Sequence, residues 1–402
     1  AAHQTERVAE LVCSNSFKST DLTNAHGELK AELGRLGSLL LTVAEEARVP
    51  AGTALAVDRE LFSRAVHERV AGHPRITVVR GEVSELPSPG IVATGPLTSA
   101  ALAAAIASRL GVEGLAFYDA IAPIVSHESL EQDRLYPLSR WGKGDGRDYL
   151  NAPLTPEEYE AFLQALTAAD QFTAHEFDQV AYFEGCLPIE EMARRGPDTL
   201  RFGPMKPVGL PDPRTGREPW AVVQLRREDR AGQMWNLVGF QTRLRIPEQR
   251  RVFALIPGLA RAEFLRYGSI HRNSYINSPA SLGPGLTARD DAGLFFAGQL
   301  TGVEGYTESL GTGLLAGINL ARHLAGLPPA VPPPTTMLGA LYRYLREADP
   351  RHFQPMNANW GLVDPIDPAL WARGRDGKKK ERKLAKLVER AGQDFDRWRA
   401  EL

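Results

Sequence analysis

Two cysteines are the side chains in this chain best suited to nucleophilic chemistry. Cys13 lies among small polar residues (14–16), and Cys186 lies at a Gly-Cys-Leu-Pro break just before a predicted helix at 189–195. A helix N-terminus favours the thiolate, which is the form that attacks carbon. Glu184 could act as a general base, although its charge would oppose thiolate formation. Either cysteine could equally be a small buried hydrophobic residue.

A run of ordered glycines is the most specific pattern. A predicted strand at 294–297 leads into a glycine-rich turn and a helix that starts near Ser309. Glycine lets a ligand approach the backbone, and a helix N-terminus offers free N–H groups to a phosphate or flavin. The alternative is a turn that serves packing alone. The candidate cofactor contacts are Gly298, Gly302, Gly305, Tyr306, Glu308, Ser309 and Gly311.

A second predicted strand, Ile91–Thr94, ends in a Thr-Gly-Pro turn. Thr94 and Gly95 fit beneath an FAD, where the carboxyl ends of parallel strands bind cofactors. Taken alone, this short motif fits an ordinary strand-end turn equally well. Together with the glycine run it predicts an FAD site.

Composition excludes several classes of protein. The 402 residues suffice for two domains, and 43% hydrophobic with 24% charged residues is typical of a globular protein. A net charge of −2 gives no overall bias toward nucleic acid. Two distant cysteines lack the spacing of a disulfide framework or a metal site, which favours a reducing cytoplasm. We expect no membrane span, signal peptide or metal, and we expect a monomer without an obligatory protein partner.

Apolar periodicity indicates α/β structure in the N- and C-terminal parts of the chain and a different type of structure between them. Apolar spacing predicts a helix over 28–48, followed by a helix capped by Asp58 and a strand at 76–80. Residues 115–275 mix extended segments with one clear helix at 156–169, which indicates an α+β insertion. The predicted parts are an FAD-binding domain in two pieces (1–114 and 276–345), the insertion (115–275) and a helical tail (346–402).

The tail carries six Lys or Arg against one Glu over residues 377–386. Such a run is usually a solvated helix face, but it would also suit contacts with the phosphates of a nucleic acid. The candidates are Lys378, Lys379, Lys380, Arg382, Lys383 and Lys386.

Residues 293–321 resemble the C-terminal flavin motif of the GidA-related FAD enzymes of tRNA modification. Within that family, further motifs are similar to the folate- and FAD-dependent tRNA uracil-5 methyltransferases, and they follow the family order along nearly the whole chain. They are VCSNSF (12–17), ATGPLTS (93–99), YFEGCLPIEEMARRG (182–196), RFGPMKPVGL (201–210), HRNSYINSP (271–279) and FQPMNANWGL (353–362).

The resemblance implies an α/β fold with a doubly wound, Rossmann-like FAD-binding domain of the glutathione-reductase type. Such domains open with a β-α-β unit that carries a G-x-G-x-x-G turn. That unit is absent from the printed sequence, which begins at Ala1 rather than at a methionine. We therefore expect further residues before Ala1, and much weaker FAD binding if the unit is truly missing.

The resemblance also implies a reaction. A methylene carbon from 5,10-methylenetetrahydrofolate reaches C5 of the T-loop uridine in tRNA, reduced FAD supplies electrons, and NADH or NADPH restores the flavin. Because uracil C5 is a poor nucleophile, a thiolate must first add to C6. We favour Cys186 for that attack, with Glu184 as a possible base, and expect Cys13 at the flavin as an acid/base or alternative nucleophile.

The same resemblance implies that His271 stacks on the folate pterin. Arg272 would meet a folate carboxylate or a tRNA phosphate, with a solvated surface arginine equally plausible. Three other functions stay open: a GidA-type enzyme that modifies the wobble uridine, a small-molecule NAD(P)H-dependent flavin oxidoreductase, and a non-catalytic tRNA-binding or folding factor. The last would tolerate loss of both thiols.

Overall fold

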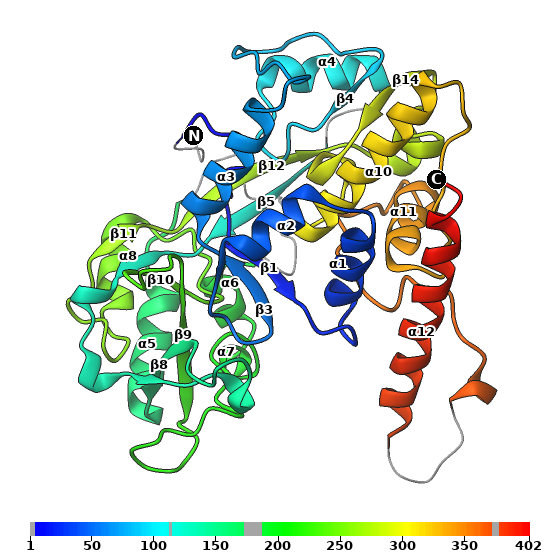
Figure 1. Ribbon diagram of the computed structural model, residues 1–402. Coiled ribbons are helices and arrows are strands. Elements are labelled where there is room, and N and C mark those ends of the chain that lie inside the picture. Colours follow the sequence, from blue (N-terminus) through cyan, green and yellow to red (C-terminus); the bar gives the residue numbers. More distant parts are fainter. Residues whose placement is uncertain (1–4, 112–114, 173–186, 372–377) are drawn as a thin grey trace. The chain divides into compact units, whose positions relative to one another are not determined.

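The computed structural model describes residues 5–111, 115–172, 187–371 and 378–402, except the side chains of 115–119, 271 and 272 (Figure 1). The chain divides into two compact units, which comprise residues 1–16, 44–76 and 117–272 (unit 1) and residues 17–43, 77–116 and 273–402 (unit 2). Unit 1 contains most of the predicted insertion. It also takes in 1–16 and 44–76, which we expected in the FAD-binding domain.

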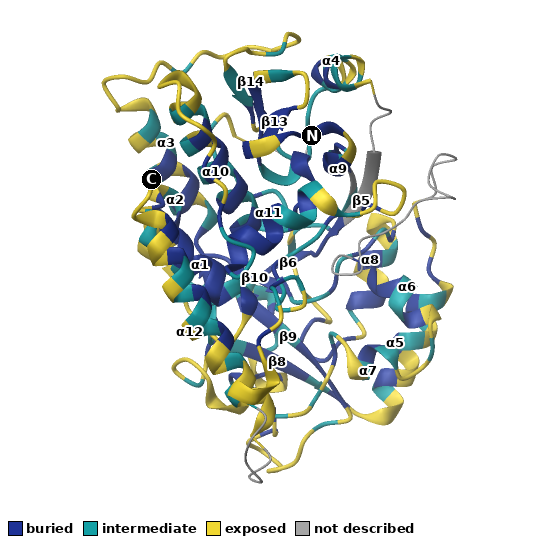
Figure 2. Ribbon diagram, turned by 90° about the vertical axis from the view of Figure 1, so that its right-hand side faces the viewer, coloured by how far each residue is buried: buried dark blue, intermediate teal, exposed yellow. Residues whose placement is uncertain are grey.

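Unit 1 is built on a six-stranded sheet of order β11-β6-β10-β9-β8-β7, in which neighbouring strands pair antiparallel. The strands β8 and β9 are buried along most of their length (Figure 2). Phe162, Phe240 and Phe253 pack together in the core, with ring centroids 5.8 to 6.0 Å apart. The strands are β6 (Ile124–Ser126), β7 (Tyr136–Pro137), β8 (Tyr149–Leu154), β9 (Ala221–Arg227), β10 (Met234–Leu237) and β11 (Phe264–Arg266). The helices are α3 (Arg59–Ala71), α5 (Pro156–Ala168), α6 (Ile189–Arg194), α7 (Thr199–Phe202) and α8 (Ile246–Phe253).

Unit 2 holds a three-stranded sheet of order β13-β14-β4, in which β14 pairs parallel with β4. The helix α10 follows β14 and packs against it, as in an α/β fold. The Glu32 carboxylate of α1 accepts the backbone N–H groups of Met337 and Leu338, each at 2.7 Å, and so caps the start of α11. The elements are β4 (Gly90–Val92), β13 (Thr287–Ala288), β14 (Asp291–Phe296), α1 (Ala25–Arg35), α4 (Ala100–Leu110), α9 (Ser278–Ser281), α10 (Tyr306–Leu324), α11 (Met337–Glu347) and α12 (Lys379–Arg399).

Further short elements complete the chain. The strands β1 (Ser16–Ser19), β2 (Arg48–Val49) and β3 (Ala54–Val57) form a sheet of order β1-β3-β2, and β5 (Leu115–Ile121) pairs with β12 (Ser269–Tyr275). The helix α2 spans Leu39–Glu46. Among the described residues, no helix combines the length and apolarity needed to cross a membrane.

Two predicted helices are confirmed, and each begins at a residue whose side chain caps it. Asp58 caps α3 by accepting the N–H groups of Glu60 and Leu61 at 3.1 and 3.0 Å. Thr155 and Glu158 form a capping box at the start of α5.

Two predictions of elements are wrong. The helix expected over 28–48 is two helices, α1 and α2, because Gly37 adopts a left-handed φ of 72° between them. The strand expected at 76–80 is absent from the described structure, and Val79 is 85% exposed. A β-branched run forms a strand only where a partner and a core face receive it.

Candidate functional site

The glycine run forms a tight turn between β14 and α10. Gly298, Gly302 and Gly305 all have positive φ, of 73°, 85° and 113°. A side chain at Gly302 would meet the Phe353 ring at 2.5 Å, and one at Gly305 would collide with the Glu308 carboxylate and meet the Lys18 ammonium at 3.1 Å. The predicted pattern is therefore confirmed, but α10 begins at Tyr306, three residues before the expected start.

Glu308, in the first turn of α10, is a buried acidic residue contacted by two partly exposed basic residues. Its side chain is fully buried, and Oε1 accepts hydrogen bonds from His26 Nδ1 and the Ala358 N–H, both at 2.9 Å. The Lys18 ammonium lies 3.8 Å from the same oxygen. The second oxygen, Oε2, has no hydrogen-bond partner within the described part of the chain.

Opposing effects set the protonation of this carboxyl. Burial alone raises the pKa of Glu308, but the hydrogen bond from His26 and the charge of Lys18 outweigh it and hold the pKa below its usual range. The group is therefore a carboxylate at neutral pH. Its second oxygen, next to a helix N-terminus that admits no side chain at Gly305, is therefore a candidate partner for a ligand donor.

The two predicted cofactor segments lie side by side. Phe296 of β14 pairs with Val92 of β4, and the Ala297 N–H donates to the Val92 carbonyl at 3.0 Å. Thr94 and the Gly298 turn therefore follow the carboxyl ends of neighbouring parallel strands, where α/β sheets bind ligands. Thr94 and Thr98 hydroxyls are 2.7 Å apart and close the turn around Gly95.

Two sequence motifs far from the glycine run fold onto these turns. The Ser274 N–H donates to the Pro96 carbonyl at 3.0 Å, and the Ile276 N–H donates to the Leu300 carbonyl at 2.8 Å. The segment 353–362 reaches the glycine turn through Met356, whose N–H donates to the Gly302 carbonyl at 3.0 Å. Unit 2 thus assembles four of the quoted motifs in one place.

The Tyr306 ring packs on Phe17 of β1, with ring centroids 5.4 Å apart, and the Thr307 hydroxyl donates to the Phe17 carbonyl at 3.0 Å. Ser309 continues the first turn of α10, where its N–H donates to the Gly305 carbonyl at 3.0 Å. Gly311 differs from the other predicted cofactor contacts because it lies in a helix-packing interface. It is buried, and a side chain there would meet Leu338 at 3.1 Å, so its glycine serves close helix packing.

Cys13 is a partly exposed cysteine of unit 1. The neighbouring Asn15 is fully buried and donates from Nδ2 to the carbonyls of Val57 and Arg227, both at 2.9 Å. Asn15 therefore anchors the loop that carries Cys13.

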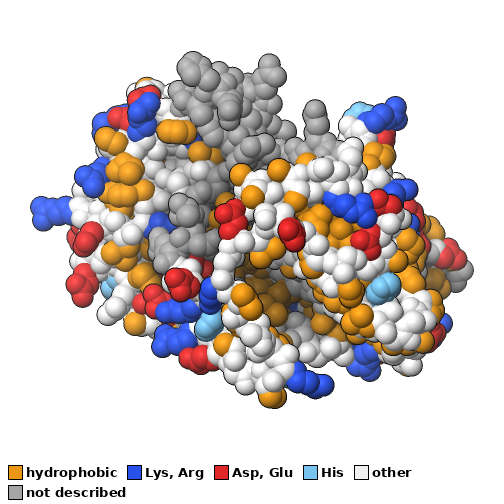
Figure 3. Space-filling model, turned by 90° about the horizontal axis from the view of Figure 1, so that it is seen from above, with side chains coloured by type: hydrophobic (Ala, Val, Ile, Leu, Met, Phe, Trp, Pro, Cys, Tyr) orange, Lys and Arg blue, Asp and Glu red, His pale blue; other side chains and the backbone are white. Residues whose placement is uncertain are grey.

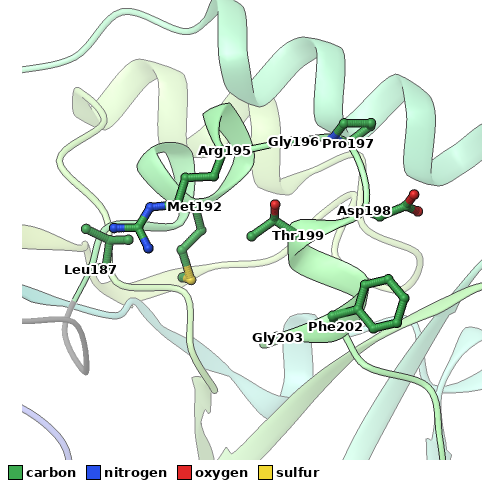
Figure 4. Close-up of a pocket in the computed structure, with 9 residues that line it drawn as sticks. All are labelled: Leu187, Met192, Arg195, Gly196, Pro197, Asp198, Thr199, Phe202 and Gly203. Carbon is green, nitrogen blue, oxygen red and sulfur yellow. The ribbon is translucent and has the colours of Figure 1, made fainter.

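Cys186 and Glu184 lie outside the described residues. The residues that follow them line a cavity of about 570 Å³ between α6 and α7 (Figure 4). Its lining begins at Leu187, directly after Cys186, and includes Arg195 and the exposed Phe202. For His271 and Arg272 the structure describes only the backbone, within β12.

The predicted basic run occupies the start of α12. Lys378, Lys379 and Lys380 are exposed. Arg382 donates to the Trp371 carbonyl at 3.1 Å, Lys383 lies 5.5 Å from the Trp371 ring, and Lys386 pairs with Glu389 at 2.6 Å. On the face shown in Figure 3, by contrast, positive and negative side chains are interspersed.

Sequence reasoning missed Lys18 and His26. Neither residue belongs to a spacing pattern with Glu308, and Lys18 adopts a positive φ of 64° that its residue type does not suggest. His26 follows the helix cap Asn24 by two residues, which is a structural signal only. Their shared carboxylate is visible only in the folded chain.

The chain is similar to known proteins in its sequence and in its fold. The family model described as "Glucose inhibited division protein A" matches residues 1–328. The chain is 58% identical over 388 residues to a methylenetetrahydrofolate--tRNA-(uracil-5-)-methyltransferase TrmFO of Geobacter sulfurreducens, covering 96% of this chain and 89% of that one. It is 55% identical over 399 residues to a TrmFO of Thermus thermophilus, covering 99% of this chain and 88% of that one. The form II crystal structure of Aquifex aeolicus GidA superposes with a TM-score of 0.68 at 15% identity, over 97% of this chain and 68% of that one, which supports the fold.

Proposed function

Because this chain belongs to the GidA family, and within it to the TrmFO group, we propose roles for its residues in the methyl transfer to tRNA for which that group is named. The chain is a folate-dependent methyltransferase that acts on the uracil C5 of tRNA. The observation that carries this conclusion is identity of 55 to 58% to such enzymes over nearly the whole chain.

We propose that unit 2 holds the flavin end of FAD. Three observations support a fit: the unpaired Glu308 Oε2, the positive-φ turn at Gly305, and Thr94 and Gly298 at neighbouring strand ends. Gly302, Tyr306 and Ser309 complete the candidate contacts. When bound, reduced FAD supplies the electrons that turn the folate methylene into a methyl group, with NADH or NADPH as the proposed reductant.

Lys18 is a positive group beside this turn in unit 2. The Glu308 carboxylate holds it there, and the Gly305 backbone leaves room beside it. A cation held at a ligand site stabilises negative charge that develops on the ligand. We propose that Lys18 and the start of α10 together stabilise the more negative, reduced state of the cofactor.

The proposed covalent steps belong to the thiols. The Cys186 thiolate adds to C6 of the T-loop uridine, which makes C5 nucleophilic toward the folate methylene. A base then removes the C5 proton, for which Glu184 is the candidate, while the bond from the transferred carbon to the folate nitrogen breaks and tetrahydrofolate leaves. Once that carbon has gained the hydride that reduced FAD would supply, the C6–S bond breaks, the 5,6 double bond re-forms and the Cys186 thiolate is released. We place Cys13 at the flavin, His271 against the pterin and Arg272 at a folate carboxylate or a tRNA phosphate. Reaction in the cytoplasm, as a monomer, is also proposed. The test is to follow a labelled methylene carbon into tRNA and to map it to the T-loop uridine.

The exposed lysines of α12 give a separate prediction. Replacing Lys379 and Lys380 by glutamine should weaken tRNA binding, because each phosphate contact releases a counterion. We expect the slope of log affinity against log salt to flatten by about one to two units. Binding titrations over a salt series check this, with Arg397→Gln and Arg399→Gln at the other end of α12 as the matched control. An unchanged slope would show that these lysines do not contact tRNA phosphates and are ordinary solvated side chains.

A further inference from the structure

The loop that carries Cys13 has an unusual set of partners within unit 1. Three successive backbone carbonyls, of Leu11, Val12 and Cys13, each accept a hydrogen bond from a guanidinium group. Arg59 donates from Nη1 to Leu11 at 2.8 Å and from Nη2 to Cys13 at 2.6 Å, and Arg266 donates from Nη2 to Val12 at 2.9 Å. Side chains thus supply the partners that a strand ladder gives elsewhere.

Arg59 is itself held in place. Its Nε donates at 2.5 Å to Glu228, whose side chain is 1% exposed, directly after the end of β9. A carboxylate that deep costs stability unless a charged partner satisfies it, so Glu228 and Arg59 require each other. Arg59 is also the first residue of α3, where the Asp58 cap fixes its backbone.

The same cap ties the clamp to the turn beyond β9. The second carboxylate oxygen of Asp58 accepts the Arg230 N–H at 3.1 Å. On the other side of the thiol, Arg226 Nε donates to the Asn15 side-chain oxygen at 3.0 Å. The backbone on both sides of Cys13 is therefore fixed by the end of β9 and the start of α3.

We propose that Arg59, oriented by Glu228, is a positioning residue for Cys13. The planar guanidinium presents two parallel donors, and these hold the carbonyls of residues 11 and 13 at a fixed spacing. The thiol is then presented in one orientation. This inference rests on the proposed role of Cys13 as a reacting group at the flavin.

The test measures the thiol and the enzyme separately in the full-length protein. Arg59→Met keeps the apolar stem of the side chain and removes its three donors, and Arg59→Lys keeps the charge without the fork. We expect iodoacetamide to alkylate Cys13 about tenfold faster in Arg59→Met, because both hydrogen bonds from Arg59 to the loop are lost. Peptide mass spectrometry separates this signal from that of Cys186. Arg59→Lys should fall between the two.

For methylation, we expect kcat of Arg59→Met to fall about a hundredfold through misplacement of the thiol, with KM for tRNA nearly unchanged. Arg64→Met, at an exposed position of the same helix, is the matched control and should change neither quantity. If Arg59→Met does not fold, Glu228→Gln loosens the same clamp and should shift alkylation in the same direction.

Unchanged alkylation and kcat in folded variants, with only a lower melting temperature, would overturn the proposal and leave Arg59 as a structural residue. A different outcome separates the two proposals. If Cys13 is alkylated faster in Arg59→Met but the wild-type protein transfers no methyl group, Arg59 still positions the thiol and the proposed function is refuted.

Discussion

Cys186→Ala is expected to abolish methyl transfer to tRNA while FAD stays bound to the full-length protein. Without a thiolate at uracil C6, C5 does not become nucleophilic, and loss of a covalent nucleophile costs roughly three orders of magnitude or more in rate. The measurement is single-turnover formation of 5-methyluridine, with the visible flavin spectrum as the readout of cofactor binding.

Cys13→Ala is the matched variant for this experiment. If Cys186 is the nucleophile, the Cys13 variant still forms a covalent adduct with tRNA and the Cys186 variant does not. Normal turnover by Cys186→Ala would remove the assigned role. The reverse pattern of adducts would exchange the roles of the two thiols.

Glu308→Ala is expected to destabilise unit 2 and to release bound flavin. Removing the carboxylate leaves the His26 ring and the Ala358 N–H without their acceptor, which costs about 2–5 kcal/mol in the free energy of unfolding, and the partly exposed Lys18 loses its neighbouring charge. Glu308→Gln keeps the shape and an oxygen that accepts the Ala358 N–H, so we expect a smaller loss of about 1–3 kcal/mol. Denaturant unfolding and flavin retention on gel filtration measure both effects. Glu347→Ala, at an exposed glutamate of the same unit, is the control.

The contacts of Glu308 also predict a pH dependence. The pKa of Glu308 lies below its usual value of 4.5, so the carboxylate contributes stability above that pH and loses it as the pH falls through the lower, folded-state pKa. The difference in unfolding free energy between wild type and Glu308→Gln should therefore be constant near neutral pH and shrink in acid. A difference that grows on acidification would show that the buried group is protonated in the folded state.

Local signals in the sequence predicted the elements that position the site. Asp58 is visible as a helix start, because a cap acts on backbone groups two or three residues away. The glycines before α10 are likewise visible, since positive φ excludes most other residues.

The long-range parts of the site could not be predicted from these signals. Lys18 and Glu308 are far apart in the chain and belong to no common pattern, so their ion pair depends on how β1 and α10 pack. The clamp of Arg59 on the Cys13 loop is of the same kind, since an arginine at the start of a helix reads as ordinary surface charge. The strand predicted at 76–80 is the opposite case. Its residues have high β-propensity, but no strand of the described structure pairs with them.

The origin of the methyl carbon tests the central claim most directly. Full-length protein is incubated with unmodified tRNA, NADPH and either methylene-labelled 5,10-methylenetetrahydrofolate or methyl-labelled S-adenosylmethionine, and the tRNA is digested and mapped. We predict that label from the folate appears in 5-methyluridine at the T-loop position and that label from S-adenosylmethionine does not. Label from S-adenosylmethionine at that position, or folate-derived label only at the wobble uridine, would contradict the assignment.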